Sequence, residues 1–281
     1  MQIKKTAALL LLAALAALVC YPVLFLAAGS LMGAEELAKN LGPIMGGGGG
    51  YVTWSLLPYT TTLRSYVELL LDSPEFFHMF WNSIKMTALI LLGQVVFGAP
   101  AAWGFARYQF PMKKLLFTLY IILMMMPFQV TMLSSFLVLD WVRLVDTQWA
   151  VILPAAFSTF PVFIMYRFFR SIPEAILESA RLDARNAWQI FLHIGLPLGS
   201  AGIISALVLG FLENWNLIEQ PLTFLKNKTL WPLSLYLPNI NLERAGVAFT
   251  ASVVTLIPAF LVFLSGQDYL EQGIVAAAVK E

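Results

Sequence analysis

Two groups of polar residues in this chain could do chemistry, and both lie in a largely apolar sequence. The first group lies within residues 171–197, where acidic, basic and amide side chains recur every three or four positions: Glu174, Glu178, Arg181, Arg185 and Gln189. This spacing predicts an amphipathic helical stretch with up to one break. Ser171, Pro173 and Glu174 fit a capping box at its start. Mixed charge suits docking on a soluble protein better than lying on a lipid surface, which favours mainly basic side chains.

The second group consists of polar residues inside apolar runs. They are Gln94, Gln129, Glu213, Asn214 and Asn216, with Trp215 between the two asparagines. Because an unpaired polar group in hydrocarbon is costly, such residues usually face a helix-bundle interior or a water-filled path. Two interpretations therefore stay open: these side chains line a path for a solute, or they hold helices together by hydrogen bonds.

Enzymatic chemistry finds little support in the sequence. The two histidines, His78 and His193, are far apart and expected on opposite sides of the membrane, which argues against a metal site or a catalytic base pair. No Gly-x-Ser-x-Gly, His-Glu-x-x-His or Walker-type motif occurs. The glycine run 46–50 is interpreted as a linker, because no Lys-Ser or Lys-Thr follows it. The single Cys20 excludes an intramolecular disulfide. We therefore expect a chain that conducts, carries or assembles something.

The composition predicts an integral membrane protein, since 59% of the 281 residues are hydrophobic and only 12% are charged. A net charge of +1 gives no global field that would recruit nucleic acid. Six spans are expected, at residues 6–28, 84–106, 115–139, 149–166, 198–218 and 247–265. The first is interpreted as a retained anchor, because it is longer than the apolar core of a signal peptide. Pro127 should kink the third span, and residues 62–71 should form a short surface helix.

The basic residues indicate the orientation. Most of the 17 Lys and Arg residues fall on the side of the N-terminus: Lys4, Lys5, Arg107, Lys113, Lys114, Arg167, Arg170, Arg181, Arg185 and Lys280. The positive-inside rule therefore predicts that both termini and residues 171–197 are cytoplasmic.

These residues also carry a resemblance to a known family. Residues 178–198, ESARLDARNAWQIFLHIGLPL, resemble the EAA loop of binding-protein-dependent ABC importer permeases, and the fuller match is to the carbohydrate-importing, maltose-type group. Five further segments are similar to the recurring pattern of that group: FWNS at 80–83, WAVILP at 149–154, FFRSIP at 168–173, NWN at 214–216 and QDYLEQGI at 267–274. The resemblance covers the chain from about residue 62 onward.

The resemblance implies an all-α polytopic fold with six transmembrane helices and a cytoplasmic coupling helix. It implies a bacterial or archaeal cytoplasmic (inner) membrane protein that pairs with a second permease, two ATP-binding subunits and an extracytoplasmic solute-binding protein that delivers a sugar. This chain would bind no cofactor, and ATP and Mg would sit on the partner subunits. By the same resemblance Glu178 would anchor the coupling helix in the ATPase, and Asp183 would stabilise the loop. The implied coupling set is Glu174, Glu178, Ser179, Ala180, Arg181, Asp183, Ala184 and Arg185.

Two departures from the family pattern affect this loop. Ser179 replaces an alanine, which is a small change, and Ala184 with Arg185 replaces Gly-Ala. Without that glycine, the break between the coupling helix and the next helix is expected to be shifted or tightened.

The expected organisation has three parts: an anchor at residues 1–28, an extracytoplasmic loop with the Gly-rich linker at 29–81, and a permease core at 82–281. The core contains the coupling loop 171–197 and a cytoplasmic tail, 266–281, whose last residues resemble tails that reach the ATPase in some relatives. Other hypotheses are a permease for an amino acid or a phosphate ester, and a membrane scaffold or insertion factor that transports nothing. An intramembrane hydrolase is disfavoured, because no nucleophile and base pair can be assembled.

Overall fold

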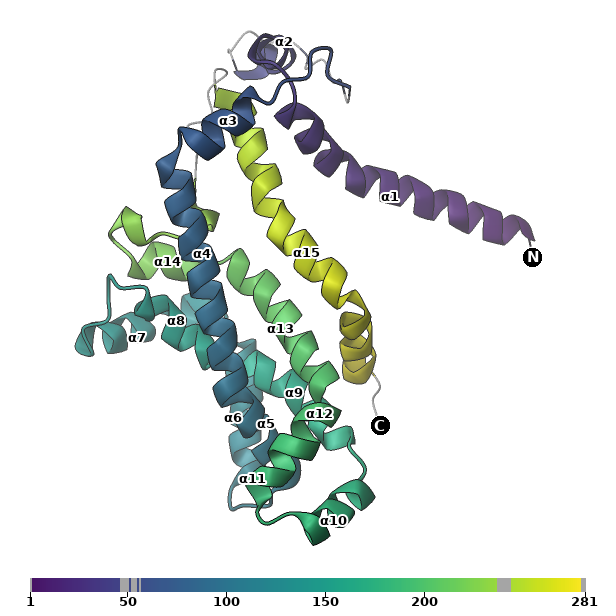
Figure 1. The fold of residues 1–281 in the computed structure, drawn as a ribbon, viewed down its shortest axis with the longest axis vertical. Helices are drawn as coiled ribbons and strands as arrows, with labels where there is room; N and C mark the ends of the chain where they lie inside the picture. The colour runs from purple at the N-terminus through teal and green to yellow at the C-terminus, as the bar shows by residue number, and fades with distance from the viewer. Residues whose placement is uncertain (1, 46–50, 52–54, 56, 237–243, 279–281) are drawn as a thin grey trace. The chain divides into compact units, whose positions relative to one another are not determined.

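The computed structural model of the chain describes residues 2–45, 51, 55, 57–236 and 244–278. Across these ranges the secondary structure is helical, apart from an isolated antiparallel bridge between Met32 and Thr61. The all-α prediction is therefore confirmed (Figure 1). The chain divides into two compact units, Met1–Phe77 with Tyr236–Pro258, and His78–Leu235 with Ala259–Glu281. The predicted Gly-rich linker, 46–50, and the end of the predicted tail, 279–281, lie outside the described residues.

The smaller unit contains α1 (Gln2–Ser30), α2 (Ala34–Met45), α3 (Arg64–Leu71) and the first residues of α4 and α15. Its core is formed by Ala28, Met32, Leu37 and Ala245, with Phe249 packed against them. Helix α3 confirms the short helix expected at 62–71. Helix α2 was not predicted, although an acidic first turn is a typical signal of a helix start. Its Leu37 is buried, as on the apolar face of an amphipathic helix.

The larger unit contains α4 from His78 onward, α15 from Ala259 onward, and the helices between them. With their full bounds, these helices are α4 (Pro74–Gly93), the π-helical η1 (Gln94–Gly98), α5 (Ala99–Arg107), α6 (Lys113–Met125), α7 (Phe128–Trp141), α8 (Trp149–Ala156), α9 (Thr159–Ser171), α10 (Glu174–Asp183), α11 (Ala187–Ile190), the π-helical η2 (Phe191–Gly195), α12 (Leu196–Leu198), α13 (Ser200–Trp215), α14 (Glu219–Phe224), the short 3₁₀ turns η3 (Lys228–Leu230) and η4 (Leu233–Leu235), and α15 (Ala245–Ala278).

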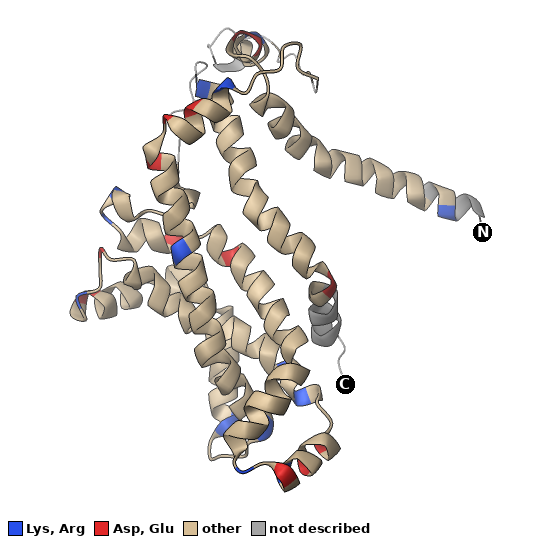
Figure 2. Ribbon diagram, viewed as in Figure 1, with Lys and Arg blue, Asp and Glu red and all other residues tan. Residues whose placement is uncertain are grey.

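The number of membrane spans agrees with the prediction. Within the described residues, four helical stretches are long and apolar enough to cross a membrane without a sharp bend: Ala8–Ser30, Pro74–Arg107, Trp149–Ser171 and Ala245–Leu270. Two bent pairs, Lys113–Met125 with Phe128–Trp141 and Ala187–Leu198 with Ser200–Trp215, bring the number to six when each pair is one span. Charged residues are sparse along α4, α13 and α15 and lie mainly at helix ends and on α10 (Figure 2).

Three helix breaks shape the larger unit. The bend between α6 and α7 is 106° and falls at Met126 and Pro127, as the missing N–H of proline predicts. Helices α8 and α9 are separated at Phe157 and Ser158. The stretch Ala187–Leu198 meets α13 at 69° at Gly199, where an added Cβ would overlap the Phe169 ring. The fifth span therefore differs from the predicted 198–218, because its first arm begins at Ala187 and is tilted away from the second.

The core of the larger unit joins the spans to the charged loop. Trp103 on α5 packs edge-on against Phe169 on α9, with ring centroids 5.4 Å apart. The same buried cluster includes Leu177 on α10 and Phe191 on η2. Gly195 lies against Trp103 so closely that an added Cβ would be 2.8 Å from its ring. The loop is thus anchored by apolar contacts as well as by its chain connections.

A second anchored segment lies between α14 and η4. The Asn82 side-chain amide donates to the carbonyls of Thr229 at 2.8 Å and Trp231 at 3.1 Å, and its oxygen accepts from Gln148 Nε2 at 2.8 Å. Ser83 Oγ accepts from the Leu233 N–H at 2.7 Å. These residues of α4, with Gln148 just before α8, therefore fix the course of the segment 225–235.

Candidate functional site

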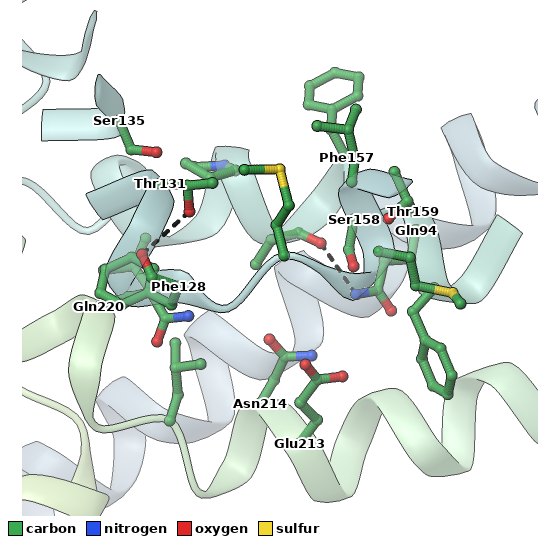
Figure 3. A pocket seen from close by; sticks show the side chains of 18 of the residues that line it. Gln94, Phe128, Thr131, Ser135, Phe157, Ser158, Thr159, Glu213, Asn214 and Gln220 are labelled. Carbon is green, nitrogen blue, oxygen red and sulfur yellow. Dashed lines mark hydrogen bonds between the residues drawn. The ribbon is translucent and has the colours of Figure 1, made fainter. Parts of the chain in front are cut away.

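A cavity of about 360 Å³ lies among the broken spans of the larger unit (Figure 3). Met126 and Phe128 contribute from the α6–α7 break, and Phe157 and Ser158 contribute from the α8–α9 break. Met126 and Ser158 have extended backbones, with ψ of 125° and 141°. At membrane depth, non-helical backbone is tolerated only where it is buried in protein or lines a water-filled cavity. Two such breaks at one cavity indicate a functional space rather than ordinary packing.

Polar side chains from several helices line this cavity. Three of them belong to the set predicted from sequence: Gln94 on η1, with Glu213 and Asn214 on α13. Hydroxyl and amide groups near helix breaks have no sequence pattern of their own, so the other polar lining residues were not predicted. They are Thr131, Ser135, Ser158, Thr159 and Gln220. Glu213 and Asn214 both lie beside the cavity in Figure 3. The arrangement supplies amide, carboxylate and hydroxyl groups, with phenylalanine and methionine between them.

Gln94 is the most deeply buried of these groups, with 3% of its surface exposed. Its Nε2 donates to the Ala155 carbonyl at 3.0 Å, which satisfies a backbone group next to the α8–α9 break. Its Oε1 has no partner among the described residues. Gly210 on α13 leaves room for that oxygen, since an added Cβ would be 2.8 Å from it. Gln94 therefore ties helices together and lines the cavity at the same time. That it lines a path for a solute stays a prediction.

The other three residues predicted for the path do not line this cavity. Gln129 Nε2 donates to Glu219 Oε1 at 2.6 Å and so links α7 to α14. Trp215 is 2% exposed and stacks on Phe211, with centroids 5.4 Å apart. Asn216 is exposed, and its Nδ2 donates to the Leu212 carbonyl of its own helix at 2.9 Å. These three side chains have local packing or surface roles in this structure.

The charged loop begins differently from its prediction. Ser171 ends α9 and its hydroxyl donates to the Phe168 carbonyl at 2.8 Å, so it does not cap the next helix. Pro173 is the N-cap residue of α10 and offers no side-chain cap. The expected capping box is therefore wrong. The reason is that α9 extends five residues past the predicted end at Tyr166 and takes Ser171 into its last turn.

The break after α10 needs no glycine. Ala184 has φ −82° and ψ 134°, an extended conformation that alanine adopts without strain. Asn186 then caps α11, because its Oδ1 accepts from the Gln189 N–H at 2.8 Å. The Gln189 side chain in turn accepts from the Arg185 N–H at 3.0 Å. An extended residue and an asparagine cap therefore make the break at the position where a glycine was expected to be needed.

Helix α10 presents a charged and largely exposed surface. Leu177 is its one buried residue, and Leu182 is 88% exposed. Glu178 and Asp183 are exposed and make no hydrogen bond or ion pair with the described residues. Ser179 Oγ bonds back to the Ile176 carbonyl at 2.9 Å, while Ala180 and Ala184 are half-buried. The exposed leucine and free carboxylates are typical of a docking surface for a protein partner.

Arg107, the last residue of α5, contacts the start of the charged loop and was not predicted to do so. Its guanidinium forms an ion pair with Glu174 at 3.2 Å and donates to the backbone carbonyls of Phe169 and Ile172. Arg181 pairs with the same Glu174 carboxylate at 2.9 Å. In the sequence, Arg107 indicates only a positive charge at the end of an apolar run. Its partners lie more than 60 residues away, so spacing could not reveal them.

Comparison with known proteins decides the family. Residues 94–276, well over half of the chain, match the family described as "Binding-protein-dependent transport system inner membrane component". The chain belongs to that family. Its resemblance to importer permeases is thereby confirmed, and the cavity and the charged loop both lie inside the matched region.

Individual relatives match over most of their length. The permease is 26% identical over 92% of the chain to the arabinooligosaccharides transport system permease protein AraQ of Halalkalibacterium halodurans, covering 91% of that protein. It is 25% identical to the sn-glycerol-3-phosphate transport system permease protein UgpE of Yersinia enterocolitica, over 73% of the chain and 74% of that protein. A bacterial ABC transporter involved in the import of alginate shares the fold, with a TM-score of 0.81 and 19% identity over 95% of this chain and 96% of that one.

Family membership makes this chain a multi-pass inner-membrane permease of a binding-protein-dependent importer. It places the chain among transport components rather than enzymes, in agreement with the sequence. A scaffold that transports nothing is disfavoured on the same ground.

Proposed function

We propose that this permease imports a neutral sugar or oligosaccharide that a solute-binding protein delivers, and that ATP hydrolysis on partner subunits drives the import. The observation that carries this proposal is the cavity at the two helix breaks, lined by Gln94, Glu213 and Asn214. Its volume of about 360 Å³ falls within the usual size of small-molecule sites. Amide and hydroxyl groups with aromatic neighbours suit the hydroxyl groups of a polyol. Relatives named for arabinooligosaccharide and lactose transport support a sugar cargo.

Glu213 favours a neutral cargo over an anionic one. The glutamate lies beside the cavity, and an ionised carboxylate would repel a phosphate ester or a uronic acid. The similarity to the sn-glycerol-3-phosphate permease is the specific reason to retain an anionic solute as the second candidate.

The energy source lies outside this chain in our proposal. Two ATP-binding subunits would hold ATP and Mg at the cytoplasmic face, and a second permease would complete the membrane pore. Helix α10 and the two residues after it would dock in the ATPase pair. The docking residues would be the exposed Glu178, Ser179, Asp183 and Arg185, together with the half-buried Ala180 and Ala184. This arrangement requires both termini to be cytoplasmic, as the distribution of basic residues predicts. The remaining parts of the proposed core, 82–281, would then move as the ATPase pair closes.

The proposal is tested by reconstituting the permease with its partner subunits and its binding protein in proteoliposomes. Uptake of radiolabelled arabinotriose, lactose and sn-glycerol 3-phosphate is measured with and without ATP. We expect uptake of a neutral sugar that requires both ATP and the binding protein. Uptake of sn-glycerol 3-phosphate alone would favour an anionic cargo. Uptake at the same rate with and without ATP would contradict import driven by ATP hydrolysis.

A further inference from the structure

Arg107 joins the ends of three helices at one side chain. It is the last residue of α5, and its guanidinium contacts the C-terminal end of α9 through the Phe169 carbonyl. It also donates to the carbonyl of Ile172, in the short link between α9 and α10, and pairs with Glu174, the first residue of α10. The Arg107 side chain is only 10% exposed, although Glu174 is 52% exposed. A buried cation at a helix junction is costly unless it is paired. Here the two terminal nitrogens of the guanidinium make the three contacts, whereas the buried Nε has no partner among the described residues.

Helix α10 has few other attachments to the spans. Only Ile172 and Pro173 connect it to α9, and both residues have extended backbones, with ψ of 125° and 137°. Leu177 is the single buried side chain of α10. Ile172 and Leu177 belong to the same buried cluster as Phe169, so apolar contacts also hold this link. Without the Arg107 contacts the link would bend more easily, and a push on α10 would move the spans less.

The neighbours of Arg107 are already joined to one another. Trp103, one turn earlier on α5, packs edge-on against Phe169 at 5.4 Å, and the Arg107 guanidinium lies 5.8 Å from the Trp103 ring centre. Helices α5 and α9 therefore form one packed body, and Arg107 is the polar contact that adds α10 to it.

We propose that Arg107 is a positioning residue that makes α10 move with α5 and α9 as one rigid body, so that displacement of α10 by the ATPase subunits reaches the cavity-lining spans. This proposal rests on the proposed function, because it assumes that α10 receives that displacement. The role requires arginine specifically. A guanidinium offers five donors in a fixed planar fork, and here it reaches two carbonyl oxygens and a carboxylate at once. A lysine ammonium keeps the charge but not the fork.

The test compares Arg107→Lys with Arg170→Lys in the complete reconstituted complex. Arg170 is a suitable control because it lies in the last turn of α9 and is exposed. Among the described residues it makes one hydrogen bond, from its Nη1 to Tyr166 Oη at 3.0 Å. The measured quantity is the number of sugar molecules taken up per ATP hydrolysed, using the sugar that the wild-type complex transports. We expect Arg107→Lys to lower this ratio by about 5- to 150-fold, the usual range of a coupling free energy between sites. Arg170→Lys should leave the ratio unchanged.

The ratio separates coupling from a simple loss of folded protein, which lowers uptake and ATP hydrolysis in proportion. Glu174→Gln provides a milder variant that keeps the two carbonyl contacts of Arg107, and we expect an intermediate ratio. An unchanged ratio in both Arg107→Lys and Glu174→Gln would overturn the proposal. Failure of the wild-type complex to take up any solute with ATP would instead contradict the proposed function.

Discussion

Replacing Asn82 with alanine should destabilise the permease by detaching the segment 225–235 from the spans. Asn82 is 5% exposed and takes part in three hydrogen bonds, two to the carbonyls of Thr229 and Trp231 and one from Gln148. A typical intramolecular hydrogen bond contributes about 1 kcal/mol to the free energy of unfolding, so the loss should be about 3 kcal/mol. At roughly 2–4 °C per kcal/mol, the melting midpoint should fall by about 6–12 °C.

Asn216→Ala is the matched control for this prediction, because Asn216 is exposed and bonds only to the Leu212 carbonyl of its own helix. Tryptophan fluorescence would report the melting midpoint of each purified variant in the same detergent and at the same heating rate, since irreversible melts depend on that rate. Limited proteolysis should cut the segment 225–235 faster in Asn82→Ala alone. Equal midpoints and equal cleavage in the two variants would refute the view that Asn82 anchors this segment.

Three further changes test other parts of the structure. Glu178→Arg should leave membrane insertion intact but abolish ATP-coupled uptake, which parallel immunoblot and uptake measurements would show; full coupling would contradict docking through this face. Gly210→Ala should lower the melting midpoint, because its Cβ would lie 2.8 Å from Gln94 Oε1 and such overpacking costs about 1–3 kcal/mol. Asn186→Ala should remove a helix cap that contributes about 1 kcal/mol. Hydrogen exchange at the Gln189 amide should then be roughly fivefold faster, and unchanged exchange would argue against the cap.

The elements that follow from local sequence were predicted well. Long apolar runs located the spans, and Pro127 located the bend between α6 and α7 because proline removes a backbone donor wherever it occurs. The amphipathic pattern at 171–197 predicted a helical stretch with a break, and the structure has one between Asp183 and Ala187.

The features that depend on packing were not predicted. Ser171 looks like a helix cap in the sequence, yet α9 extends through it because Phe169 is buried against Trp103 and holds that turn in place. The bend at Gly199 depends on the nearby Phe169 ring, which is 30 positions earlier in the chain. Arg107 meets Glu174 across a separation of 67 residues. Contacts of this kind leave no periodic signal, so spacing alone cannot predict them.

The same limit explains why only some of the polar residues predicted for the path line the cavity. Gln94 and Asn214 were predicted because they are polar groups in apolar runs, and so were Gln129 and Asn216. The direction in which each side chain points depends on helix rotation and on the breaks, and this separates the residues at the cavity from those outside it.

Sugar uptake by Asn214→Ala and Asn216→Ala tests the central claim, that cargo crosses through this cavity, most directly. The two asparagines are two positions apart on α13, and each donates to the carbonyl four residues earlier, at 2.7 and 2.9 Å, but only Asn214 lines the cavity. We predict that Asn214→Ala lowers uptake by the reconstituted complex about tenfold, the effect of losing one hydrogen bond to the cargo, while Asn216→Ala transports at the wild-type rate. Equal uptake by the two variants would contradict the claim.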